Sequence, residues 1–162
     1  MTKLRLETSR FGTVEVEEGL VLTFVSPILG FETHKRFVVL DHSDNSPFKW
    51  LQSVDDPALA FVITNPKFFA IPYEFMLPDE ASEKLEAKQA EDLLVFTIVN
   101  IPSEQPALMT ANLLAPVVVN QKNLYTMQVV LQNSEFSTRT RLLPDSALSG
   151  AGGAASVSEG KG

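Results

Sequence analysis

The stretch Pro47–Pro66, PFKWLQSVDDPALAFVITNP, decides the fold because two apolar segments flank an Asp-Asp-Pro break. Side chains before the break alternate in the period-2 pattern of a strand with one apolar face. After the break, Leu59–Ile63 is a short, partly β-branched apolar run, which favours a buried strand over a helix. Pro57 cannot donate to a strand ladder, so the chain is expected to reverse there. The stretch predicts two paired strands in a β core, tipped by the negative charges of Asp55 and Asp56.

The same alternation of strand and turn patterns continues along the chain. Lys3–Thr8 and Thr13–Glu17 flank a glycine-containing turn, which predicts an opening hairpin. Further strand candidates are Leu20–Phe24, Phe37–Leu40, Glu74–Leu77, Leu93–Ile101, Leu108–Leu113, Val117–Asn120 and Tyr125–Leu131. Many short strands separated by turns predict a mainly β protein, an antiparallel β-barrel-like or sandwich fold in a single domain.

One helix is expected, at about residues 79–88. Asp79 is placed to cap its N-terminus, and Lys84 and Lys88 suit its C-terminal end. Because the segment is polar around most of its circumference, with Leu85 among few apolar anchors, the helix is predicted to lie on the surface.

The end of the chain differs from the rest in composition. Residues 144–162 are rich in Ala, Gly and Ser and hold too little apolar surface to order themselves, so this tail is predicted to be disordered. Residues 1–143 are left as the one folded domain, an ordinary size for a single core.

The composition also limits the compartment and the chemistry. The chain has no cysteine, so disulfides, thiolate catalysis and Cys-ligated zinc are excluded. No apolar run approaches the roughly 18–20 residues that cross a bilayer, and the first residues hold no apolar signal-peptide core. A cytoplasmic protein without membrane contact is expected.

The balance of charge is acidic, with a formal net charge of -7 and a pI near 4.8. Direct binding to nucleic acid requires a basic footprint and is not expected. An acidic surface attracts basic proteins, although it can also serve solubility alone.

Residue patterns of known active sites are missing. No glycine-rich phosphate loop is present, and His34 and His42 lack the helical spacing of a zinc pair. Asp55 and Asp56 are adjacent, so on a strand end they would point to different sides. We therefore expect no enzyme, no cofactor and no metal. The enzymatic alternative is a small hydrolase that uses these aspartates and Arg139.

A second alternative is a carrier of a small ligand. A β-barrel can enclose a ligand when aromatic side chains such as Trp50 and Phe61 line its lumen. An interior filled by side chains would count against this function.

Several blocks of sequence together resemble one protein family, that of the flagellar assembly factor FliW. The blocks are Arg10-Phe11-Gly12, Leu29-Gly30-Phe31-Glu32, Arg36-Phe37, Trp50-Leu51-Gln52-Ser53-Val54-Asp55-Asp56-Pro57, Met109-Thr110-Ala111-Asn112-Leu113-Leu114-Ala115-Pro116, Asn120, Gln128-Val129-Val130-Leu131 and Ser137-Thr138-Arg139. They follow the family's order over roughly Leu4 to Leu142. The resemblance implies a partner-switching protein that binds CsrA, a basic RNA-binding translational repressor, and relieves its repression of flagellin messenger RNA. It also implies that flagellin binds the same protein and sequesters it until flagellin is secreted.

For the basic partner CsrA, acidic residues at turns are the expected contacts. They are Asp55 and Asp56 first, then Glu32 and Glu74.

For flagellin, whose terminal segments are amphipathic helices in the family picture, an apolar surface is needed. The loop between Pro66 and Pro72 offers Phe68, Phe69 and Ile71. These side chains either tuck under the barrel or form an exposed docking patch.

Overall fold

The computed structural model describes residues 2–41, 45–132 and 135–144. Its strands are β1 Lys3–Thr8, β2 Gly12–Glu17, β3 Leu22–Ser26, β4 Arg36–Asp41, β5 Phe48–Ser53, β6 Ala60–Thr64, β7 Leu93–Asn100, β8 Thr110–Ala111, β9 Val117–Asn120, β10 Tyr125–Gln128 and β11 Thr140–Arg141. The helical segments are α1 Asp79–Leu85 and the 3-10 turns η1 Glu18–Leu20, η2 Pro66–Phe69, η3 Ala90–Asp92 and η4 Pro106–Leu108.

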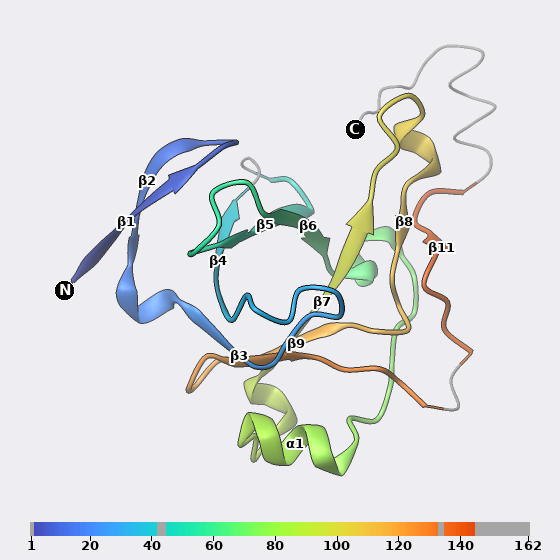
Figure 1. Cartoon of the computed structure of the whole chain (residues 1–162). Coiled ribbons are helices and arrows are strands. Elements are labelled where there is room, and N and C mark those ends of the chain that lie inside the picture. Colours follow the sequence, from blue (N-terminus) through green and yellow to red (C-terminus); the bar gives the residue numbers. More distant parts are fainter. Residues whose placement is uncertain (1, 42–44, 133–134, 145–162) are drawn as a thin grey trace.

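Seven of these strands close into a barrel in the order β3-β4-β5-β6-β7-β9-β10 (Figure 1). The first half of β7 pairs with β9, and β10 returns to β3, so the sheet has no gap between its ends. The second half of β7 pairs instead with β8, which carries β11 at its outer edge. The prediction of a mainly β, barrel-like domain is confirmed. Its antiparallel character is not complete, because β3 and β10 run parallel with Tyr125 opposite Thr23.

The opening stretch forms the predicted strand pair at the centre of the barrel wall. β5 and β6 are antiparallel, with Phe48 opposite Thr64 and Gln52 opposite Ala60. Leu51 points into the barrel and is fully buried. Its neighbour Trp50 points the other way, since successive side chains of a strand lie on opposite faces.

The barrel interior is filled by side chains. They form one cluster of buried residues, Leu22, Phe24, Ile28, Phe37, Leu51, Ile63, Val117 and Val119, with Phe61 packed against it. Trp50 lies outside the interior, where its ring meets that of Phe11 edge-on at 5.6 Å. The carrier alternative required both Trp50 and Phe61 to line a lumen, and only Phe61 faces inward.

The predicted opening hairpin is a separate two-stranded sheet, β1–β2, at the side of the barrel (Figure 1). Its turn is tied to the opening stretch, because the Ser9 amide donates to the Pro57 carbonyl at 2.8 Å. Gly12 supports the turn with a φ of 69°, a conformation that glycine adopts without strain.

The helix is found on the surface, as predicted, but it is shorter than the expected 79–88. α1 ends because Glu86 adopts a left-handed conformation with a φ of 55°. Pro78 is the N-cap residue, so the prediction that Asp79 caps the helix is wrong; Asp79 lies in the first turn. Leu85, fully buried, anchors α1 against Val118 and Met127 on β9 and β10.

One predicted strand is not part of any sheet. Glu74–Leu77 lies in a segment between η2 and α1 to which no strand is assigned. The tail from residue 145 onward lies outside the described residues, as does His42, so the predicted domain boundary near 143 stays a prediction.

Candidate partner-binding surfaces

The Asp-Asp-Pro turn is organised from below by one buried side chain, that of Gln52. Its carboxamide nitrogen lies 3.1–3.3 Å from four backbone carbonyl oxygens. These belong to Ser53, Asp56, Pro57 and Leu59. Since an amide nitrogen carries only two hydrogens, the four oxygens share them. The glutamine thus holds the turn together, and this role explains its place between Leu51 and the turn.

Both aspartates of the turn have local partners. The hydroxyl oxygen of Ser53 accepts from the amides of Asp55 and Asp56 at 3.1 and 3.0 Å. Asp56 in turn accepts from the Ala58 amide at 3.0 Å, which closes the turn. The Asp55 carboxylate accepts from the Arg36 guanidinium at 2.6 Å, and this bond raises the pKa of Arg36. Since Asp55 is about half exposed and already paired, the turn is less anionic than its sequence suggests.

Glu32 also acts within its own loop. Its carboxylate accepts from the Gly30 amide at 3.0 Å, and this backbone hydrogen bond lowers the pKa of Glu32. Gly30 has a φ of 89°, which few other residues adopt. The side chain of Glu32 remains exposed to solvent.

The loop proposed for flagellin offers less apolar surface than its sequence suggests. η2 is capped by Asn65, which accepts from the Lys67 amide at 2.9 Å. Phe68 is 68% exposed, but Phe69 packs beside Phe48 with ring centroids 5.7 Å apart. Ile71 is half-buried and packs against the same group of buried residues as Phe69, a group that includes Phe48. Of the two alternatives for this loop, Phe69 and Ile71 pack against the protein, and Phe68 is exposed to solvent.

Glu74 lies close to this loop. Its carboxylate is 3.0 Å from the Lys67 ammonium, and its side chain is 85% exposed. Asp55 and Glu74 are the predicted acidic contacts that form ion pairs in the described part of the chain, and Glu74 is the more exposed of the two.

The predicted site residues fall at two ends of the barrel. Ser53 at the end of β5 lies opposite Phe37 at the start of β4, so the β3–β4 and β5–β6 loops share one end. These loops carry Glu32, Asp55 and Asp56. Phe48 at the start of β5 lies opposite Thr64, so η2, which follows β6, lies at the other end. A single compact partner would therefore not contact all of these residues at once.

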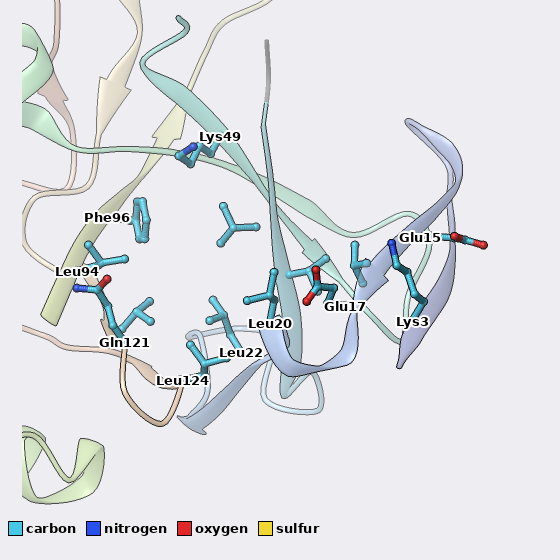
Figure 2. A pocket seen from close by; sticks show the side chains of 14 residues that line it. Lys3, Glu15, Glu17, Leu20, Leu22, Lys49, Leu94, Phe96, Gln121 and Leu124 are labelled. Carbon is cyan, nitrogen blue, oxygen red and sulfur yellow. The ribbon is translucent and has the colours of Figure 1, made fainter. Parts of the chain in front are cut away.

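A groove opens at the second end of the barrel, between its mouth and the hairpin (Figure 2). Its volume is about 610 Å³. Apolar side chains line most of it: Val16, Leu20, Leu22, Val38, Val39, Leu94, Phe96, Val119 and Leu124. Charged and polar side chains border it: Lys3, Glu15, Glu17, Lys49 and Gln121. Leu20 and Leu94 are 59% and 42% exposed, so apolar surface is open to a partner here.

Sequence reasoning did not find this groove. Leu20, Leu94 and Leu124 come from η1, β7 and the β9–β10 turn, and nothing in their local sequence joins them. The one available signal was Leu20 itself, an apolar residue directly after the Glu-Glu-Gly break.

The second marked block of sequence, Met109–Pro116, serves packing. Met109 is buried, and the side-chain Oδ1 of Asn112 accepts from the Ala115 amide at 3.0 Å. The backbone carbonyl of Leu113 accepts from the Tyr73 hydroxyl at 2.5 Å. Met109 and Asn112 therefore serve packing and local hydrogen bonding.

The hydrolase alternative gains no support from this geometry. Asp55 is paired with Arg36, Asp56 closes a turn, and Arg139 is exposed on a different segment. Within residues 2–41, 45–132 and 135–144, no three His, Cys, Asp or Glu side chains gather in a way that could hold a metal ion. No helix in that part of the chain is long and apolar enough to span a membrane.

Fold and surface together define a small, closed, side-chain-filled β-barrel with an open apolar groove. The family model of the FliW protein matches residues 5–142. The chain belongs to the FliW family.

Individual relatives agree with this assignment. The chain is 38% identical over 143 residues to a flagellar assembly factor FliW from Magnetococcus marinus, covering 88% of this chain and 87% of that one. It is 42% identical over 134 residues to a flagellar assembly factor FliW from Bdellovibrio bacteriovorus, covering 83% and 76%. A crystal structure of the flagellar assembly factor FliW superposes with a TM-score of 0.80 at 34% identity, covering 88% of this chain and 99% of that one.

Proposed function

We propose that this protein is a cytoplasmic, non-enzymatic factor of flagellar assembly that binds both CsrA and flagellin. In this function it draws CsrA away from flagellin messenger RNA, and flagellin competes for it until flagellin is secreted. Membership of the FliW family supports the flagellar role. The observation that carries the protein-binding role is the open apolar groove beside a filled barrel, because a filled interior leaves the surface as the place for a partner.

Charge supports CsrA as one partner. A net charge of -7 favours encounter with a basic protein over encounter with RNA. An acidic body docked on CsrA would also repel RNA phosphates, even without covering the RNA site. Among the proposed contacts, Asp55, Asp56 and Glu32 would act from one end of the barrel and Glu74 from the other.

The groove supports flagellin as the other partner. An amphipathic helix binds by laying one apolar face into a groove, with anchors spaced three or four residues apart. Leu20 and Leu94 would meet such anchors, and Lys3, Glu15 and Glu17 at the border would meet its polar face. The exposed Phe68 at the same end of the barrel is an additional contact in this proposal, with Phe69 and Ile71 holding its loop.

Titration calorimetry of the full chain with CsrA and with flagellin, singly and in competition, tests the proposal. We expect each protein to bind and flagellin to lower the apparent affinity for CsrA. Binding to neither would overturn the function.

A further inference from the structure

Between η2 and α1 the chain crosses the surface as an extended segment, residues 71–78, which we call the edge segment (Figure 1). Its side chains alternate between the protein body and solvent. Those packed against the body are Ile71, Tyr73, Phe75 and Leu77. Those exposed are Pro72, Glu74 and Met76. This period of two is that of a β-strand.

Side chains, not backbone bonds, hold the edge segment in place. The Tyr73 hydroxyl donates to the Leu113 carbonyl at 2.5 Å, and burial raises the pKa of Tyr73. The Tyr73 ring lies 5.2 Å from that of Phe75 and 4.8 Å from that of Phe136. The segment is thus ordered in the free protein, so binding a partner would not cost the conformational entropy of ordering it.

The backbone of the edge segment is unpaired within the described part of the chain. Its last hydrogen bond on one side runs from the Ile71 amide to the Pro66 carbonyl at 3.3 Å. On the other side, the Pro78 carbonyl accepts from the Ser82 amide at 3.0 Å. Between them, the amides of residues 73–77 and the carbonyls of residues 71–77 bond to no described protein group. A fixed, extended backbone with free donors and acceptors is a template for another strand.

We propose that the edge segment binds an extended, basic segment of a partner protein by β-strand addition. The charge of the surroundings selects this occupant. Residues 67–84 carry four carboxylates, those of Glu74, Asp79, Glu80 and Glu83, against two ammonium groups, those of Lys67 and Lys84, which pair with Glu74 and Glu80 and leave a net negative charge. Glu74 lies in the middle of the edge, so a second copy of this chain would place like charges side by side and is disfavoured. The inference rests on the proposed function, since the basic partner is CsrA.

The exposed side chains also specify the occupant. On an added strand, the residues beside Glu74 and Met76 are two positions apart and face the same side. The occupant therefore carries a Lys or Arg two residues from a large apolar side chain. Met76, which is 90% exposed, supplies the apolar contact.

Hydrogen exchange of the full chain, alone and saturated with CsrA, tests the inference. A strand presents alternate amides to its two sides. With CsrA bound, we expect the amides of one alternate set to exchange at least about tenfold more slowly. That set is either Glu74 and Met76, or Tyr73, Phe75 and Leu77. In the free protein, both sets exchange fast.

A pair of variants separates the backbone from the side chain. Met76→Pro removes one amide, and Met76→Ala keeps it. Because that amide makes no hydrogen bond in the free protein, we expect both variants to melt within about 2 °C of each other. If the set containing Met76 is protected, Met76→Pro should weaken CsrA binding about tenfold more than Met76→Ala does.

The outcomes separate the two proposals. Calorimetric binding of CsrA with no change at residues 73–77 would overturn strand addition and leave the proposed function standing. Protection by flagellin in place of CsrA would overturn the choice of occupant. Failure of the wild-type protein to bind CsrA would overturn the proposed function and, with it, this inference.

Discussion

Arg36 on β4 and Asp55 in the β5–β6 turn form an ion pair, with a guanidinium nitrogen 2.6 Å from a carboxylate oxygen. The pair joins two loops at one end of the barrel and neutralises one of the two charges that mark the turn. Both side chains are about half exposed, so solvent screens their attraction.

Replacing Arg36 by Gln should change stability little and partner binding more. We expect the free energy of unfolding to fall by less than about 0.5 kcal/mol, as for other exposed ion pairs. If the turn meets a basic partner, Arg36→Gln frees Asp55 and tightens CsrA binding, and Asp55→Asn weakens it. Calorimetry on both variants measures this. Equal affinities for the two variants would remove Asp55 from the CsrA surface.

Gln52→Leu should destabilise the barrel. The substitution keeps the volume of the side chain but removes its donor. The carbonyls of Asp56, Pro57 and Leu59 keep the backbone amides of Leu59, Ser9 and Ser53, so a loss of about 1 kcal/mol is expected. Urea unfolding measures the loss. The exposed Gln105 provides the control, since Gln105→Leu should stay within about 0.5 kcal/mol of the wild type. A neutral Gln52→Leu would show that the turn is held by other groups.

Glu86→Gly should stabilise the protein. Glu86 ends α1 with a φ of 55°, where glycine is free of strain, so a gain of about 0.5–1 kcal/mol in unfolding free energy is expected. Glu83→Gly, inside the helix, should instead lose about 1 kcal/mol. Thermal melts of the two variants should move in opposite directions, and movement in the same direction contradicts the assigned end of the helix.

The ion pair between Lys49 and Asp41 should make stability sensitive to acid. The Lys49 ammonium, 2.7 Å away, lowers the pKa of Asp41 in the folded state. A lowered carboxyl pKa contributes stability above the unfolded value, about 4, and this contribution is lost as the pH falls through the folded value. The difference in melting temperature between wild type and Lys49→Met should therefore shrink below about pH 4. A difference that is constant from pH 3 to 7 would argue against this origin.

A matched pair of leucines can compare the groove with the opposite end of the barrel. Leu20 borders the groove and is 59% exposed, and Leu29 lies in the β3–β4 loop and is 65% exposed. Leu20→Ser should weaken flagellin binding about tenfold, the scale of a lost apolar anchor. Leu29→Ser should leave it unchanged. Both variants should melt like the wild type, because neither side chain is buried; equal binding by both would place flagellin elsewhere.

The sequence predicted the elements whose signals are local. The hairpin around Gly12, the strand pair on either side of Pro57 and the surface helix were all readable from alternation and turn residues. The parallel pairing of β3 with β10 was not, because it joins residues about 100 positions apart, such as Thr23 and Tyr125. Glu74–Leu77 shows a further limit: its alternation is that of a strand, but the pairing that would place it in a sheet depends on neighbours the pattern does not reveal.

The candidate site was predictable only in part. Charged and apolar residues could be identified, but not their partners. Arg36 approaches Asp55 from a strand 19 positions away, and Lys67 approaches Glu74 from the preceding turn. Exposure was equally hidden: Phe68 and Phe69 are neighbours, and only the fold decides that Phe69 packs on Phe48.

The proposed antagonism of CsrA is tested most directly by the anisotropy of a fluorescent RNA from the flagellin leader, bound to CsrA. Adding this protein should release the RNA, and adding flagellin afterwards should restore the complex. RNA that stays bound at saturating concentrations of this protein would contradict the proposed antagonism of CsrA.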